Sequence, residues 1–246
     1  MAATEWYKDW FNSPYYHKLY FERDDIEAKS FIKRLLVHLN PSPGSRMLDI
    51  ACGKGRHSKF LAEQNYDVAG IDISIDSINY AKQFEVENLH FYLHDMRLLF
   101  WVNYFDYAFN FFTSFGYFNT QREHNDAMRT IAASLRPGGI LVIDYLNVHY
   151  AEDHLKRDEI KQQDGATYTI QRWQDEHHFY KKIIVTDEAL QQPVIHTERV
   201  AKFSLHNFTD MLSLQKLQIS QVFGNYELNG YDAIKTPRMI IIAKKN

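Results

Sequence analysis

The stretch LDIACGKGRHS, residues 48–58, joins an apolar run to a polar one through Gly53 and Gly55. Such a pattern predicts a strand, a tight turn and the start of a helix. The turn and the helix start present unpaired backbone N–H groups and the positive end of the helix dipole, and the glycines let a ligand approach the main chain closely. The stretch therefore predicts a binding site for an anionic or polar group of a ligand.

Polar residues also close the apolar runs that follow. Asp72 ends the run VAGI, at a spacing where its carboxylate can accept hydrogen bonds from both ribose hydroxyls of an adenosine ligand. The next two runs end in His94-Asp95-Met96 and in Asn110-Phe-Phe-Thr113. Because ligands bind at the carboxyl ends of the strands in open α/β sheets, these residues are expected to surround one site.

The elements that must position these residues alternate between short apolar runs and amphipathic stretches up to about residue 150. This alternation predicts an α/β fold with parallel crossover units, a Rossmann-like doubly wound and mostly parallel sheet of seven strands. The turn Arg136-Pro-Gly-Gly139 precedes the fifth strand, ILVIDY. From residue 151 the apolar residues recur with period two, which predicts an antiparallel β insertion after that strand.

We expect a single domain. Its predicted parts are a helical cap at 1–44, a cofactor-binding core at 45–150, the antiparallel insertion at 151–203, and a final segment at 204–246. That last segment is expected to hold a helix near 205–216 and two strands that return to the sheet edge.

Composition narrows the class of protein. The chain has 246 residues, 45% of them hydrophobic, and a formal net charge of −3. A balance of 28 basic and 31 acidic residues without a long basic block argues against a nucleic acid partner. The one cysteine, Cys52, cannot form an intrachain disulfide, and the first residues do not resemble a signal peptide. We therefore expect a cytoplasmic protein without a membrane segment.

Five motifs in order carry a family resemblance. LDIACGKGRHS, GIDIS, HDMR, FDYAFNFFTSFGYF and LRPGGILVIDY, spread over about residues 45–146, resemble the class I S-adenosylmethionine-dependent methyltransferases. The amino-terminal stretch WYKDWFNSPYYHKLY is similar to that of an uncharacterised bacterial subgroup of the small-molecule type. The glycine motif departs from common patterns, because Ala51 stands at a frequent first glycine and Ser58 where a dinucleotide-binding motif has its third small residue.

The resemblance implies S-adenosylmethionine as cofactor and assigns roles to particular residues. The methionine moiety would lie on Asp49, Ala51, Gly53 and Gly55, and Asp72 would bind the ribose. Ile73 and Met96 would pack on the two faces of the adenine, although both would also suit an ordinary core. Asp95 would accept from the adenine amino group, and the Asn110 carbonyl would face the cofactor amino group and the substrate. The other residues that the resemblance places near the cofactor are Tyr16, Tyr20, Cys52, Arg56, His57 and Phe111.

The chemistry implied is methyl transfer to a small-molecule nucleophile, at nitrogen or oxygen. An activated methyl donor needs mainly orientation, but four residues are candidate bases: His17, Tyr117, Asp144 and His149. Asp144 could equally cap a loop, and Arg56 and His57 could simply begin a helix. The run FNFFTSFGYF could stabilise a cation or fill the core. Because it lacks the Asn-Pro-Pro-aromatic pattern, it argues against methylation of a nucleobase.

Two other functions remain compatible with the residues. A NAD-dependent oxidoreductase would share the glycine turn and the acidic second strand, but would leave HDMR and RPGGILVIDY without a role. A non-catalytic cofactor-binding protein could keep the same fold. The 12 histidines show no spacing typical of a structural zinc site, so no metal is expected. We expect a monomer or a homodimer.

Overall fold

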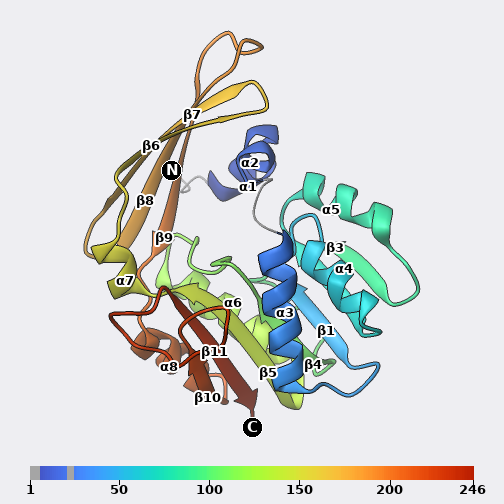
Figure 1. Ribbon diagram of the computed structural model, residues 1–246. Coiled ribbons are helices and arrows are strands. Elements are labelled where there is room, and N and C mark those ends of the chain that lie inside the picture. Colours follow the sequence, from blue (N-terminus) through green and yellow to red (C-terminus); the bar gives the residue numbers. More distant parts are fainter. Residues whose placement is uncertain (1–5, 21–24) are drawn as a thin grey trace.

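The computed structural model describes residues 6–20 and 25–246, with the side chains of 25–27 left aside (Figure 1). Residues 1–5 and 21–24 of the predicted helical cap lie outside the described residues. The described helices are α1 (Trp6–Phe11), α2 (Pro14–Leu19), α3 (Asp25–Leu39), α4 (Arg56–Glu63), α5 (Ile75–Ala81), the 3₁₀ turn η1 (Lys82–Phe84), α6 (Gln121–Ser134), α7 (Val148–Asp153) and α8 (Leu205–Ser213).

Seven strands form the main sheet, in the order β10-β11-β5-β4-β1-β2-β3. Their bounds are β1 (Arg46–Ile50), β2 (Asp67–Asp72), β3 (Leu89–Leu93), β4 (Phe105–Asn110), β5 (Leu135–Leu146), β10 (Leu217–Phe223) and β11 (Arg238–Lys245). The strands from β3 to β5 are parallel, and β11 pairs antiparallel with both β5 and β10. This order and direction confirm the predicted Rossmann-like fold and the return of the last two strands to the sheet edge.

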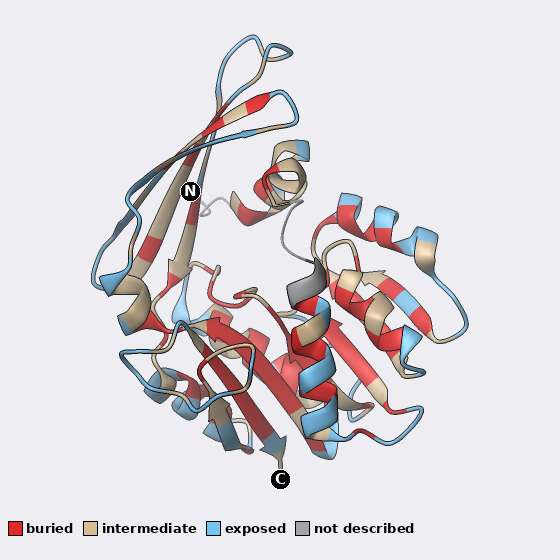
Figure 2. Cartoon of the chain, viewed as in Figure 1, coloured by how far each residue is buried: buried red, intermediate tan, exposed pale blue. Residues whose placement is uncertain are grey.

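The two faces of the sheet are covered by different helices. On one face, residues of α3, α4 and α5 such as Phe31, Leu61 and Ile78 form one buried cluster. On the other face, α6 and α8 bury Met128 and Phe208 in a second cluster. Figure 2 shows the central strands buried between these layers. Successive side chains along each strand point to opposite faces of the sheet, so the same strands contribute buried residues to both clusters, as a doubly wound fold requires.

A second sheet is inserted between α7 and α8. It contains β6 (Asp158–Gln163), β7 (Ala166–Gln174), β8 (His178–Thr186) and β9 (Val194–Ala201), all paired antiparallel in chain order. A third hydrophobic cluster joins Trp10 of α1 and Leu19 of α2 to this sheet. Figure 1 accordingly shows α1 and α2 beside the inserted sheet, above the carboxyl ends of the main strands.

Three element boundaries differ from expectation. The turn Arg136–Gly139 lies inside β5, because Leu135 already pairs with Phe105 before a register shift interrupts the ladder. The insertion opens with α7, so residues 151–153 are helical. The final helix ends at Ser213, and Lys216 takes a left-handed backbone conformation that stops it from continuing. None of the helices within the described part of the chain is both long and apolar enough to cross a membrane.

Candidate functional site

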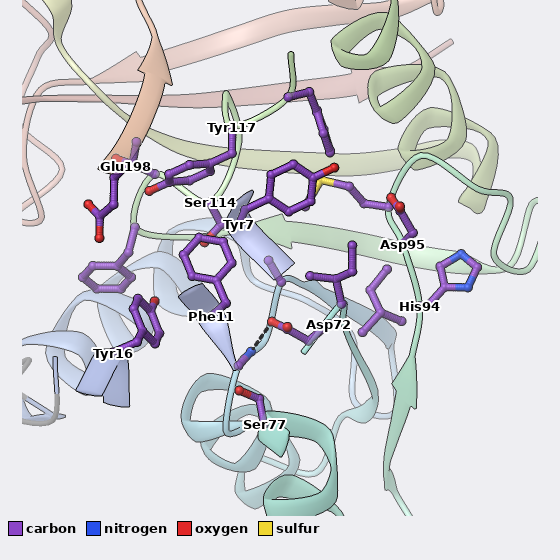
Figure 3. A pocket seen from close by; sticks show the side chains of 18 of the residues that line it. Tyr7, Phe11, Tyr16, Asp72, Ser77, His94, Asp95, Ser114, Tyr117 and Glu198 are labelled. Carbon is purple, nitrogen blue, oxygen red and sulfur yellow. Dashed lines mark hydrogen bonds between the residues drawn. The ribbon is translucent and has the colours of Figure 1, made fainter. Parts of the chain in front are cut away.

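A cavity lies where the carboxyl ends of β1 to β4 face α1, α2 and β9 (Figure 3). It holds about 890 Å³ free of protein atoms, including the part open to solvent. Its lining comes from segments far apart in the chain: Tyr7, Phe11, Tyr16, Tyr20, Ala51, Gly53, Ile71, Asp72, Ile73, Ser77, His94, Asp95, Met96, Phe112, Thr113, Ser114, Tyr117, Phe118 and Glu198. Of the residues predicted to touch the cofactor, Tyr16, Tyr20, Ala51, Gly53, Asp72, Ile73, Asp95 and Met96 are in this lining.

The two glycines of the first turn have different reasons for being glycine. Both have left-handed backbones, with φ of 55° at Gly53 and 79° at Gly55. A Cβ atom on Gly53 would meet no atom within 4 Å, so this position is open toward the cavity. A Cβ atom on Gly55 would lie 2.5 Å from the ring of Phe91. Gly53 therefore leaves room for a ligand, whereas Gly55 has a packing role against Phe91 of β3 that the sequence did not predict.

Ser58 replaces the third small residue because it supports a buried carboxylate. Its hydroxyl donates a hydrogen bond to Asp49 Oδ2 at 2.6 Å, and the two residues are 0% and 1% exposed. Burial raises the pKa of Asp49 to about 6, and the hydrogen bond from Ser58 opposes that rise. Asp49 does not line the cavity, so the pair lies beneath the turn and supports it from below.

Asp72 is held by the backbone around it. Its Oδ2 accepts the Gly53 N–H and its Oδ1 accepts the Ser74 N–H, both at 2.8 Å; the dashed line in Figure 3 marks the first. Burial raises the pKa of Asp72, and these backbone hydrogen bonds oppose the rise. An ionised carboxylate has about four acceptor sites, so Asp72 retains acceptor capacity for a ligand hydroxyl.

Asp95 lines the cavity and forms an ion pair with Arg97. The Arg97 side chain contacts both Asp95 oxygens, at 2.6 Å in the shortest case, and reaches Glu123 Oε1 at 2.7 Å. Burial raises the pKa of Asp95, but the hydrogen bonds and charge of Arg97 outweigh it and hold the pKa below its usual value. Asp95 is thus an ionised acceptor in a fixed orientation.

Asp144 supports the loop after β4. It is fully buried at the end of β5, and its Oδ2 accepts the Phe112 N–H at 2.9 Å and the Tyr226 hydroxyl at 3.1 Å. Arg238 donates to its Oδ1 at 2.8 Å. Phe112 and Thr113 have left-handed backbones, with φ of 56° and 60°, and line the cavity. Of the two roles open to Asp144, the loop-capping one matches these contacts.

The wall opposite the main strands is completed by Glu198 of β9, which is only 8% exposed. Its Oε1 accepts hydrogen bonds from Trp10 Nε1 at 2.8 Å and from the Tyr20 hydroxyl at 2.7 Å. Lys181 Nζ donates to the same Tyr20 hydroxyl and lies 3.9 Å from Glu198 Oε2. Sequence reasoning missed Glu198. The period-two pattern of VIHTERVA puts it on the face of His196, but nothing local identifies that face as the inner one.

Several predicted residues lie outside the cavity lining. Cys52, Asn110 and Phe111 are buried behind it, and Asn110 Nδ2 donates to the Ile50 carbonyl at 3.2 Å. Within the described residues Asn110 Oδ1 has no hydrogen-bond partner. Arg56 and His57 begin α4 and face a separate small hollow beside α3.

The candidate bases are spread over different places. Tyr117 lines the cavity and packs against Trp6 and Phe11. His149 is exposed on α7, 3.6 Å from Glu152. His17 lies outside the lining, and burial and the charge of Lys54 lower its pKa to about 4. Among these three, only Tyr117 is in reach of a ligand in the cavity. The described side chains contain no group of three or more His, Cys, Asp or Glu that could hold a metal ion.

Comparison with known proteins identifies the family. Residues 41–219 match the model of a methyltransferase domain. The chain is 28% identical over 134 residues to dTDP-3-amino-3,4,6-trideoxy-alpha-D-glucopyranose N,N-dimethyltransferase of Streptomyces venezuelae, covering 54% of this chain and 56% of that protein. It is 31% identical over 122 residues to glycine N-methyltransferase of Mus musculus, covering 43% of this chain and 41% of that protein. The matches thus span about half the length of these relatives.

The fold has solved counterparts. A crystal structure of an S-adenosylmethionine-dependent methyltransferase from Clostridium acetobutylicum superposes with a TM-score of 0.78 at 17% identity, over 94% of this chain and 96% of that one. At that identity the likeness concerns the fold, including the sheet order described above. Since the family model covers most of the chain, the chain belongs to the methyltransferase domain family, as its resemblance to S-adenosylmethionine-dependent methyltransferases predicted.

Proposed function

We propose that the protein transfers the methyl group of S-adenosylmethionine to a nitrogen or oxygen nucleophile of a small molecule. The observation that carries this proposal is the convergence of Gly53, Asp72 and Asp95 from three strand ends on one cavity. Bound there, S-adenosylmethionine would supply a methyl group already activated by its sulfonium.

The residues present fit this cofactor. Asp72 has remaining acceptor capacity for a ribose hydroxyl, and the open space beside Gly53 admits a ligand close to the main chain. Ile73 and Met96 line the cavity as apolar surfaces for a flat ring, and the ionised Asp95 can accept from an amino group. These features support the roles that the motifs predict for these residues.

A small acceptor is supported by the shape of the site. The cavity is bounded by the main strands on one side and by α1, α2 and β9 on the other, with the aromatic side chains Tyr7, Phe11 and Tyr117 between them. Walls of this kind exclude water and orient a small nucleophile, which is the main requirement of methyl transfer. The relatives named above, a dTDP-amino-sugar N,N-dimethyltransferase and a glycine N-methyltransferase, support a small-molecule acceptor.

Calorimetric titration with S-adenosylmethionine, S-adenosylhomocysteine and NADH, run in parallel, tests the proposal. We expect micromolar binding of the first two and no heat from NADH. Binding of NADH alone would favour the oxidoreductase. If none of the three binds, the cavity does not hold this class of cofactor. Binding without methyl transfer to any acceptor would favour a non-catalytic protein.

A further inference from the structure

The cavity lining has an asymmetric set of charges. Among the described residues that line it, three carry carboxylates, Asp72, Asp95 and Glu198, and none is a lysine or arginine. A lining of this kind disfavours an anionic ligand and favours a neutral or cationic one. The positively charged sulfonium of the cofactor would be stabilised by part of this negative charge. The rest of the negative charge can act on the acceptor.

Two of the three carboxylates belong to the cofactor half of the cavity. Asp72 is held by backbone amides in the position suited to the ribose, and Asp95 is paired with Arg97. Glu198 lies apart from both: Figure 3 shows it on the opposite side of the cavity from Asp95 and His94, on the side where Tyr16 and Tyr117 are drawn. Glu198 is therefore the carboxylate available to the acceptor.

The contacts of Glu198 leave one oxygen with acceptor capacity. Trp10 and Tyr20 both donate to Oε1. Lys181 Nζ forms an ion pair with Oε2 at 3.9 Å, a separation too long for a hydrogen bond, so Oε2 can still accept one. A carboxylate that is 8% exposed needs hydrogen bonds to compensate for its burial, and an N–H group of a ligand would supply them at Oε2.

We propose that the acceptor is an amine and that Glu198 binds its nitrogen through Oε2. This inference rests on the proposed function and names its substrate class. The aromatic rings of Tyr16 and Tyr117, which line the same cavity, add a further preference for a cation. Trp10 and Tyr20 act as positioning residues, because they fix the carboxylate against the cap.

The chemical step balances without a further reagent. The ammonium gives one proton to water at the part of the cavity that is open to solvent, and the nitrogen lone pair then forms the new C–N bond. The C–S bond of the cofactor breaks and its electron pair stays on sulfur. The products are the N-methylated ammonium and S-adenosylhomocysteine.

Matched acceptors test the substrate class. Two sets, benzylamine, benzyl alcohol and benzoate, and cyclohexylmethylamine, cyclohexylmethanol and cyclohexanecarboxylate, are incubated with methyl-labelled S-adenosylmethionine. We expect label in the amine products and at least about tenfold less in the alcohols and carboxylates, the scale of one charge-assisted hydrogen bond. Label mainly in alcohols or carboxylates, or in no amine while S-adenosylhomocysteine still binds, overturns the inference.

The variant Glu198→Gln tests the residue itself. Glutamine keeps an oxygen that accepts from Trp10 and Tyr20, so both hydrogen bonds to β9 are preserved while the negative charge is lost. We expect KM for the amines to rise about tenfold or more, with the affinity for S-adenosylhomocysteine unchanged. A purely structural Glu198 would leave KM as in the wild type, which would overturn the assignment.

Asp187→Asn is the matched control. Asp187 also ties the cap to the inserted sheet, since it accepts the Tyr15 hydroxyl at 3.2 Å, but it does not line the cavity. Asp187→Asn should leave the amine KM unchanged. An equal rise of KM in both variants would show that the effect comes from a weakened contact between the amino-terminal helices and the inserted sheet, and would refute a role of Glu198 in acceptor binding. If the wild-type protein does not bind the cofactor, the proposed function is refuted, and this inference with it.

Discussion

The two walls of the cavity are built in different ways. The core wall, made by the ends of β1 to β4, holds Asp72 with the amides of Gly53 and Ser74, 19 and 2 residues away in the chain. The cap wall, made by α1, α2 and β9, holds Glu198 with the side chains of Trp10 and Tyr20, 188 and 178 residues away.

The difference separates two kinds of recognition. Backbone amides are present whatever the side chains are, so the core wall keeps its geometry as long as the strand, turn and helix form. The cap wall depends on particular side chains that meet only when the cap packs on the inserted sheet. A common cofactor suits the first kind of wall, and an acceptor specific to one enzyme suits the second.

The largest expected effect comes from breaking the cap wall. Trp10 is 0% exposed, stacks on His196 at 4.3 Å and donates to Glu198. Trp10→Ala should lower the free energy of unfolding, measured by urea denaturation, by about 3–5 kcal/mol. Trp173→Ala, at a site 43% exposed, is the control and should cost far less. Equal losses would mean that Trp10 does not hold the cap in place.

Breaking the core wall should affect binding more than folding. Asp72→Ala is expected to weaken S-adenosylmethionine binding by about 1.5–3 kcal/mol in calorimetry, the scale of hydrogen bonds to a charged group. Asp76→Ala, at an exposed position on α5, should bind as the wild type does. A folded Asp72 variant with undiminished affinity would remove this residue from the site.

The core wall could be predicted from the sequence better than the cap wall, because its contacts are local and those of the cap wall join distant parts of the chain. Asp72, Gly53 and Met96 stand at fixed positions within local motifs, so they could be placed on the cavity before its geometry was known. Glu198 could not, because its inward direction depends on the register of β9 with β8, where it faces Lys181. The packing role of Gly55 could not be predicted either, because the contact that requires it, with Phe91, comes from a different strand.

A smaller effect should come from beneath the core wall. Ser58→Ala removes the hydroxyl that donates to Asp49 and should cost about 1–2 kcal/mol of stability, because it leaves a buried carboxylate less well satisfied. The pKa of Asp49, already raised to about 6, should rise further. Ser134→Ala, which loses a buried hydrogen bond to the Ile131 carbonyl, should cost less in the same assay. A larger cost at Ser134 would contradict a special role for Ser58.

The smallest effect at neutral pH is expected at the junction of the two walls. His124 is buried among Phe115, Phe118 and Phe203, and burial lowers its pKa from 6.5 to about 4. The unfolded chain therefore takes up a proton between about pH 6.5 and 4 that the folded chain does not, so stability falls as the pH falls through this window.

His124→Phe tests this dependence. It removes the titrating group while keeping an aromatic ring, so the melting temperature should fall less steeply between pH 6.5 and 4 than in the wild type. Near pH 7.5 the two proteins should differ little. An unchanged slope would show that His124 does not contribute to the acid sensitivity.

The separate hydrophobic cluster beneath the cap wall has an evolutionary consequence. Trp10, Tyr168 and Ile183 belong to this cluster, which shares the partly buried Trp6 and Phe11 with one of the two clusters of the main sheet. Substitutions in the inserted sheet are therefore expected to disturb the main sheet less than substitutions in its own clusters, so selection can change the cap wall more freely. Lineages with this architecture are expected to diverge fastest in β6 to β9, while the carboxyl ends of β1 to β3 change slowly.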